Sequence, residues 1–214
     1  DIYKYAAKIA KRITYSTAKA AFGLKPENNV GWSFYPAMQA AHILFPQFYT
    51  NKKHISVVPV GIDQDPFIRL TRDIAQDFGL EKPAALHAKF IPSLYGDPKM
   101  SSSKGGSIFL SDLPEEVEKK IKKYAFSGGR DTIEEHRKLG GNPDIDVSFQ
   151  YLRIFFEPDD KKLQKIHDDY KSGKMLTSEL KSILIEKVNA FLKEHQKRKE
   201  QAKNQLDKFI LKNN

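Results

Sequence analysis

The sequence contains no cysteine, which excludes disulfide bonds and cysteine-ligated metal sites. Its six histidines show neither HExxH nor HxxxH spacing, so we expect no zinc site. No run of about 18 apolar residues occurs, which predicts that no segment spans a membrane. Residues 1–24 lack the charged-then-apolar layout of a signal peptide, and there is no initiator methionine, as in a fragment or a processed chain.

What the sequence does contain is an excess of positive charge. The 36 lysines and arginines outnumber the 27 acidic residues, which gives a net charge of +9 and a pI near 9.4. This balance suits a polyanionic partner such as nucleic acid. A basic surface that serves only solubility has the same composition, so charge alone leaves both interpretations open. The 214 residues suffice for one large domain or two small ones.

The N-terminal part has the patterns of two helices. Apolar residues recur at helical spacing over 2–22, and Gly23 is a natural helix end, so we expect one helix there. The run "WSFYPAMQAAHILF" at 32–45 is apolar almost throughout. Because proline is tolerated in the first turn of a helix, the run predicts a buried helix that starts near Pro36.

The next segment has the pattern of a strand–helix–strand unit. "HISVVPVG" at 54–61 and "AALHAKFIP" at 84–92 are short and apolar, as in buried parallel strands. Between them, 63–80 has a helical period, with Asp63 or Asp65 as a possible cap. Ligands of such sheets bind at the carboxyl ends of the strands, and both "VGIDQD" and the segment after the second strand lie there.

From about residue 110 onward only helical patterns occur. One helix begins at Pro114, and a short one is capped by Asp131 or Thr132. Three more are expected, at 146–156, 159–173 and 176–210. The sequence therefore predicts an α/β half over residues 1–110 and an all-α half over 111–214.

The α/β half has too few strands. Only two convincing parallel strands are present, whereas a stable doubly wound sheet has more. We therefore expect that the rest of the sheet lies upstream of residue 1 or that another chain supplies it.

The loop "PKMSSSKGG" at 98–106 follows the second strand. Backbone N–H groups and hydroxyls of such a loop can turn toward an anion, and Lys99 and Lys104 can supply charge to a phosphate. A polar linker with lysines for solubility has the same composition.

The order of residues in three segments resembles one family. "PKMSSSK" resembles the KMSKS signature of class I aminoacyl-tRNA synthetases, and "VGIDQD" resembles their GxDQ ribose-binding turn. "AFSGGRDTIEEHRKLGGNPDIDVSFQYL" at 125–152 is similar to the anticodon-binding helical domain of tryptophanyl-tRNA synthetases of the archaeal and eukaryotic cytosolic type. The resemblance implies a partial Rossmann-type nucleotide-binding half, residues 1–110, and an α-helical anticodon-binding domain, residues 111–214.

The resemblance also implies roles for the loop. It implies a mobile loop over the phosphates of ATP, formed by Lys99, Met100, Ser101, Ser102 and Ser103. Lys99 would stabilise the pyrophosphate leaving group, and Mg²⁺ would bridge phosphate oxygens. The family often has lysine where this chain has Ser102, and Lys104 is the candidate for that second charge.

Four residues of the α/β half receive roles in the same way. Asp63 would accept hydrogen bonds from the ribose, and Gly61 would let the sugar approach. Gln64 and Gln39 would bind the polar end of tryptophan or of its adenylate. Asp63 could instead only cap the following helix, and Gln39 could be a satisfied core amide.

In the helical half, Arg130, Asp131 and Lys181 match the anticodon-contacting positions of the family. Arginine suits phosphate or base-edge contact, and aspartate suits a base amino group. Asp131 could also serve as a helix N-cap, and Lys181 could be a lysine on a solvated helix face.

The chain departs from the family because it has no HIGH-type motif. We therefore expect the carboxy-terminal portion of a synthetase, inactive alone. The resemblance implies a cytoplasmic homodimer that uses ATP, L-tryptophan and tRNA(Trp). Two alternatives stay open: a tyrosyl-tRNA synthetase, and a non-catalytic tRNA-binding or regulatory module derived from a synthetase.

Overall fold

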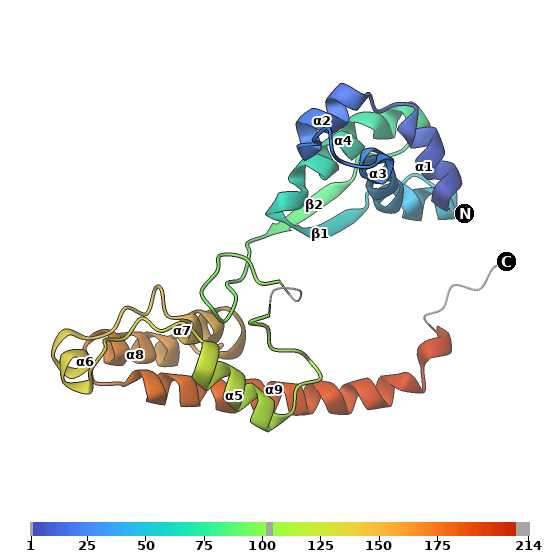
Figure 1. Ribbon diagram of the computed structural model, residues 1–214. Helices are drawn as coiled ribbons and strands as arrows, with labels where there is room; N and C mark the ends of the chain where they lie inside the picture. Colours follow the sequence, from blue (N-terminus) through green and yellow to red (C-terminus); the bar gives the residue numbers. More distant parts are fainter. Residues whose placement is uncertain (1, 102–104, 209–214) are drawn as a thin grey trace. The chain divides into compact units, whose positions relative to one another are not determined.

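The computed structural model describes residues 2–101 and 105–208. Their contacts divide the chain into two compact units, which we call unit 1 (up to Phe90) and unit 2 (from Ile91 onward) (Figure 1). The division comes earlier than residue 110 because the segment after Ile91 packs on the helices of unit 2, where Leu94 is fully buried. Packing does not decide which family domain the segment belongs to, so the domain assignment stays a prediction.

Unit 1 begins with two helices where we expected one. Helix α1 spans Ile2–Ala10 and α2 spans Tyr15–Phe22. The single helix over 2–22 is wrong because Thr14 stops it and caps the next helix, accepting a hydrogen bond from the backbone N–H of Thr17 at 3.1 Å. The predicted end at Gly23 is confirmed, in the left-handed conformation that favours glycine (φ 63°).

Helix α3 spans Val30–Thr50 and starts earlier than expected. The start near Pro36 is wrong because Asn29 caps the helix, with its side chain accepting from the N–H of Trp32 at 3.3 Å. Pro36 and Pro46 both lie inside the helix, where each lacks one backbone donor. The predicted burial is confirmed for the middle of α3, which packs against α1.

The strand–helix–strand unit is confirmed. Strand β1 (Val57–Gly61) pairs in parallel with β2 (Ala84–Ala88), and α4 (Asp65–Ala75) connects them. The register places Gly61 opposite Ala88 at the carboxyl ends of both strands. The sheet contains no further strand within the described part of the chain.

The prediction that both strands are buried is wrong. Val57 is 65% exposed and Leu86 is 66% exposed. An apolar strand with an uncovered face is the consequence of a sheet that has only two strands. The exposed face agrees with the expected shortage of strands, and where the missing strands lie stays a prediction.

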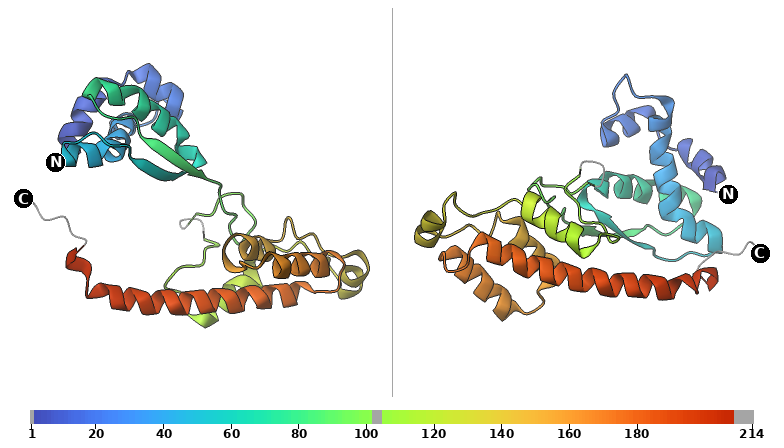
Figure 2. Two further views of the ribbon diagram at one scale, coloured as in Figure 1. Left: turned by 180° about the vertical axis from the view of Figure 1, so that it is seen from behind. Right: turned by 60° about the horizontal axis from the view of Figure 1, so that its bottom comes forward.

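The regular secondary structure of unit 2 is all helical among its described residues. Its helices are α5 (Pro114–Tyr124), α6 (Ile133–Leu139), α7 (Val147–Tyr151), α8 (Asp160–Lys171) and α9 (Thr177–Lys203). A π-helical segment, Leu152–Phe156, continues α7. Helix α9 is the longest and runs along α5, α7 and α8 (Figures 1 and 2). None of the helices described in either unit is long and apolar enough to cross a bilayer.

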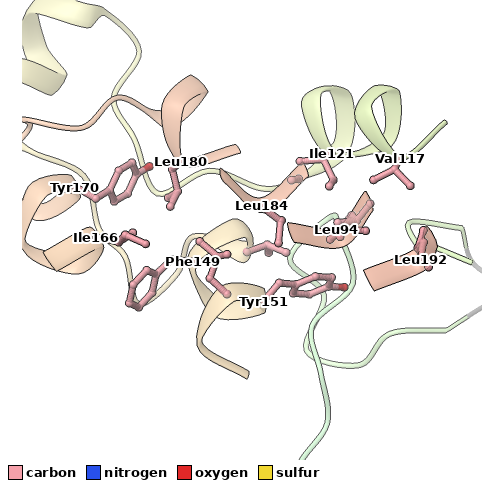
Figure 3. Close-up of a cluster of buried hydrophobic side chains, with 14 residues drawn as sticks. Leu94, Val117, Ile121, Phe149, Tyr151, Ile166, Tyr170, Leu180, Leu184 and Leu192 are labelled. Carbon is pink, nitrogen blue, oxygen red and sulfur yellow. The ribbon is translucent and has the colours of Figure 1, made fainter. Parts of the chain in front are cut away.

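The core of unit 2 is built around α9. Leu180, Leu184, Val188 and Leu192 recur every fourth residue and are all buried. Figure 3 shows side chains of α5, α7, α8 and the Leu94 segment gathered around this stripe. The segment before residues 99–104, which we call the KMSSSK loop, is therefore fixed by the same core as the helices.

Candidate functional site

The predicted ribose turn lies at the end of β1. Gly61 ends the strand, and a short 3₁₀ turn, Ile62–Gln64, leads into α4. A Cβ atom on Gly61 would lie 2.8 Å from Oδ1 of Asp63 and 3.3 Å from the ring of Phe90. A side chain at this position would therefore make the Asp63 carboxylate move, whereas the φ of −68° is open to any residue. The Asp63 side chain is exposed beside it.

The helix that follows is not capped by Asp65. The residue before α4 is Gln64, whose side chain makes no capping bond, and Asp65 is the first helical residue. The Asp65 carboxylate instead accepts from Arg69 one turn later and lies 3.2 Å from Nε2 of His87. Asp63 does not cap this helix either, because Gln64 occupies the N-cap position, and its ribose role stays a prediction.

The structure brings the two predicted tryptophan-binding glutamines together. Nε2 of Gln39 lies 3.5 Å from Oε1 of Gln64, at the long limit of a hydrogen bond, and both side chains are partly buried. A satisfied core amide does occur on the same helix, but it is Gln47, which is 1% exposed and bonds both the N–H and the C=O of Glu81. Among the described residues, Gln39 makes no such pair of bonds. The environment expected of a satisfied core amide is therefore that of Gln47 and not that of Gln39.

Gln64 also lines a hollow of about 550 Å³ on unit 1. Its walls include the rings of Trp32, Tyr35 and Phe67. None of these aromatic residues was predicted from the sequence to line a site. Trp32 is the only tryptophan in the chain. Aromatic walls with a few polar groups, here the amides of Gln64 and Asn29, are the usual lining of a small-molecule site.

Only part of the KMSSSK loop lies within the described residues. Ser102, Ser103 and Lys104 lie outside them, so their predicted roles stay untested. Lys99 is exposed, and the N–H of Met100 donates to the carbonyl of Ile91 at 2.7 Å.

The two ends of the loop are tied to each other. The N–H of Leu94 donates to the carbonyl of Gly106 at 2.9 Å, and the Ser107 hydroxyl donates to the carbonyl of Ser101 at 3.3 Å. Gly106 has a φ of 67°, and a Cβ there would lie 2.7 Å from the ring of Tyr95. The described residues on the two sides of the loop are therefore held next to each other.

Met100 turns its side chain toward the helices. It lines an apolar pocket of about 310 Å³ together with residues that include Tyr151, Phe155 and Leu192. The Tyr151 hydroxyl donates to the carbonyl of Pro92 at 2.8 Å and lies 3.9 Å from Sδ of Met100. Burial raises the pKa of Tyr151 to about 12, so this hydroxyl stays a donor at neutral pH. The contact anchors the loop, and a direct contact of Met100 with nucleotide stays a prediction.

Arg130 and Asp131 are both exposed at the start of α6. Nε of Arg130 donates to the carbonyl of Gly140 at 3.0 Å, which ties the side chain to the turn after α6. The N-cap of α6 is Thr132, whose hydroxyl accepts from the N–H of Glu135 at 3.1 Å. The interpretation of Asp131 as the N-cap is therefore wrong, because the residue that follows it caps the helix.

Lys181 is not a lysine on a solvated face. Its side chain is partly buried on α9, and Nζ donates to the carbonyl of Lys122 at 3.1 Å. Burial lowers the pKa of Lys181, and the negative charge of Asp146 opposes that shift. The solvated-face interpretation fails because α5 covers part of this side chain.

The residues that support the backbone before Arg130 were not predicted from the sequence. The buried Asp146 and Tyr170 and the partly buried Thr177 form hydrogen bonds under the segment that precedes Arg130. The two glycine pairs, 128–129 and 140–141, were the available signal, because adjacent glycines outside a linker indicate close packing of backbone.

Comparison with known proteins agrees with the resemblance. A family model described as tRNA synthetases class I (W and Y) matches residues 8–193. A tryptophan–tRNA ligase of Sulfurisphaera tokodaii is 54% identical over 211 residues, which cover 98% of this chain and 54% of the relative. The corresponding ligase of Sulfolobus acidocaldarius is 51% identical with the same coverage. The chain thus spans about half the length of the curated relatives it matches.

Solved structures of tryptophanyl-tRNA synthetases also resemble this chain. A tryptophanyl-tRNA synthetase of Aeropyrum pernix matches with a TM-score of 0.84 and 38% identity, over 95% of this chain and 56% of that one. Such a match supports both the two-stranded α/β part and the helical part as pieces of a class I synthetase fold. The chain belongs to the class I tRNA synthetases of the tryptophan and tyrosine type.

Proposed function

We propose that the protein is a tryptophan–tRNA ligase, which activates L-tryptophan with ATP and transfers it to tRNA(Trp). The observation that carries the proposal is the 54% identity to a tryptophan–tRNA ligase over 98% of the chain. The segments "AFSGGRDT" and "DIDVSF", at 125–132 and 144–149, carry the tryptophan-type resemblance within this family. By analogy with the family, the protein acts as a cytoplasmic homodimer.

In the proposed reaction, the tryptophan carboxylate attacks the α-phosphorus of ATP and pyrophosphate leaves. Lys99 carries a positive charge that stabilises the pyrophosphate as negative charge develops on it. Ser101 and the three residues that follow it supply hydroxyls and N–H groups to the same phosphates. The fixed loop ends at Leu94 and Gly106 support this role, because they limit where the loop can close.

The turn after β1 fits the nucleoside part of ATP. Asp63 would accept hydrogen bonds from the ribose hydroxyls, and a side chain on Gly61 would displace the Asp63 carboxylate. Gln64 and Gln39 would hold polar groups of tryptophan or of the adenylate. Mg²⁺ would be held mainly by phosphate oxygens and would neutralise their charge, since no three His, Asp or Glu side chains gather into a metal site among the residues that the structure describes.

An aminoacylation assay tests the proposed specificity. The full-length protein is incubated with ATP, with transcribed tRNA(Trp) or tRNA(Tyr), and with either tryptophan or tyrosine. We expect charging of tRNA(Trp) with tryptophan and none with tyrosine. Charging of tRNA(Tyr) with tyrosine would instead establish the tyrosyl alternative, which the same family model covers.

A Lys99→Ala variant tests the role of the loop in the activation step, which is measured as tryptophan-dependent exchange of pyrophosphate into ATP. We expect pyrophosphate exchange to slow by at least tenfold, because the variant lacks a charge that acts on the leaving group. Lys82→Ala is the matched control, since Lys82 is an exposed lysine that precedes β2 and lies outside the loop and the carboxyl ends of the strands. Equal rates for both variants would contradict the role of Lys99.

A further inference from the structure

Four side chains, each from a different segment of unit 2, meet in one hydrogen-bonded cluster, which we call the Tyr170 network. Its members are Ser127, Asp146, Tyr170 and Thr177. Asp146 and Tyr170 are fully buried, and the other two are partly buried. The resemblance to the family assigns no role to any of them.

The Asp146 carboxylate has two structural roles. Its Oδ1 accepts from the N–H groups of Ser148 at 2.9 Å and Phe149 at 3.3 Å, which caps α7. Its Oδ2 accepts from the N–H of Gly128 at 2.9 Å and from the Tyr170 hydroxyl at 2.8 Å. One buried charge therefore fixes both the start of α7 and the backbone two residues before Arg130.

The hydroxyls extend the network to the next glycine. The Tyr170 oxygen lies 3.0 Å from Oγ1 of Thr177, which lies 3.1 Å from Oγ of Ser127. The Ser127 oxygen accepts from the N–H of Gly129 at 2.9 Å. Burial, followed by the negative charge of Asp146, raises the pKa of Tyr170 to about 12, so its hydroxyl stays a donor at neutral pH.

Both glycines are packed too closely to carry a side chain. A Cβ on Gly128 would lie 2.0 Å from the carbonyl oxygen of Asn142, and one on Gly129 would lie 2.4 Å from Oγ1 of Thr177. The N–H of Asn142 also donates to the carbonyl of Gly128 at 2.7 Å. Two adjacent glycines have the greatest backbone freedom of any residue pair, so the direction of the chain after Gly129 depends on these bonds.

We propose that the Tyr170 network positions Arg130 and Asp131 for contact with the tRNA anticodon. Ser127, Tyr170 and Thr177 are positioning residues in this proposal, because they act on the backbone before Arg130 and do not touch the RNA. A segment that is fixed before binding loses less conformational entropy on binding, which raises affinity and selectivity. The inference rests on the proposed function, since it takes tRNA as the partner.

The test compares hydroxyl-deletion variants with a matched control in the full-length protein. Ser127→Ala and Thr177→Val remove hydroxyls of the network, and Thr177→Ser keeps one. Ser148→Ala is the control, because the buried Ser148 hydroxyl has no hydrogen-bond partner among the described residues and lies on the helix that Asp146 caps. Each variant is titrated with transcribed tRNA(Trp) and with the same transcript carrying an exchanged anticodon.

We expect Ser127→Ala and Thr177→Val to lose at least threefold of the preference for the native anticodon. Their KM for tRNA should rise by a similar factor, while tryptophan-dependent pyrophosphate exchange stays as in the wild type. Thr177→Ser and Ser148→Ala should keep the preference. A general loss of stability would weaken the binding of both transcripts equally and would leave the preference unchanged.

Two outcomes separate this inference from the proposed function. If the wild type prefers the native anticodon and Ser127→Ala and Thr177→Val keep that preference, or if Ser148→Ala loses it equally, the positioning role is overturned and the proposed function stands. If the wild type shows no preference and Arg130→Ala has no effect, the proposed anticodon contact fails, and the positioning role fails with it.

Discussion

Gly141 lies against the ring of Tyr170, and an added Cβ would be 2.5 Å from its Cε1 atom. Because both residues are buried, we expect Gly141→Ala to lower the free energy of unfolding by about 1–3 kcal/mol, the usual cost of overpacking. Chemical denaturation in urea measures this.

Gly79→Ala is the comparison for this prediction. Gly79 has a φ of 65°, but no atom lies within 4 Å of its added Cβ. Its replacement should cost only the backbone strain of about 1 kcal/mol. A Gly141→Ala protein that is as stable as the wild type would show that the backbone around Tyr170 can shift.

Tyr170 should also make stability depend on alkaline pH. In an unfolded chain its hydroxyl titrates near the ordinary tyrosine pKa of 10.0, whereas burial raises the pKa in the folded state to about 12. Between these values the folded protein keeps a proton that the unfolded chain has lost, so the free energy of unfolding falls as pH rises, by up to about 1.4 kcal/mol per unit.

The measurement is urea denaturation of the wild type and Tyr170→Phe between about pH 9 and pH 12, a range that covers the interval between the two pKa values. The pKa of Tyr151 is also raised to about 12 by burial, so the variant should keep part of the pH dependence. Identical slopes for the two proteins would mean that Tyr170 titrates normally.

At the scale of helices, two neighbouring residues at the start of α6 are expected to have different roles, one in protein stability and the other in tRNA binding. Thr132 caps the helix and Asp131 does not, although the two are neighbours. We expect Thr132→Ala to cost about 1 kcal/mol of stability. Asp131→Ala should change stability by less than about 0.5 kcal/mol and should weaken tRNA binding. A loss of stability in Asp131→Ala without a loss of binding would reverse these roles.

Helix and strand patterns predicted the existence of most elements better than their ends. The α5 start at Pro114 was predictable because proline and the two following glutamates suit a first turn. The start of α3 was missed because the side chain of Asn29 decides it, while Pro36 drew the prediction inward. The exposure of β1 and β2 was also missed, since apolar composition does not show whether a partner covers the strand.

For the candidate site, the exposed residues were predictable and their supports were not. Lys99, Asp63 and Arg130 belong to motifs that are contiguous in the sequence. Tyr170 and Thr177 lie more than a helix away from Ser127 in the chain and meet it only in the fold. A hydrogen bond between residues so far apart in the chain gives no recognisable motif in the sequence. The only local sign is the glycines that the close packing requires.

At the scale of the whole molecule, we predict that the chain holds only part of the adenylate-forming site proposed above. It has the KMSSSK loop and the GIDQ turn, no HIGH-type motif, and an exposed two-stranded sheet. We therefore expect these 214 residues, expressed alone, to show no tryptophan-dependent exchange of pyrophosphate into ATP. Exchange above background would contradict this. Anticodon-dependent binding of tRNA without exchange would agree with a module that binds tRNA and does not catalyse.

Helix α9 has a consequence for the order in which unit 2 can fold during synthesis. Leu180, Leu184, Val188 and Leu192 complete a core whose other members, from Leu94 to Tyr170, are made earlier. Until α9 has left the ribosome, Val117 and Ile121 lack the surface that they bury against in the folded unit. Unit 2 therefore cannot finish folding from its amino-terminal end, and a nascent chain that stops before Leu192 would leave these apolar side chains available to chaperones.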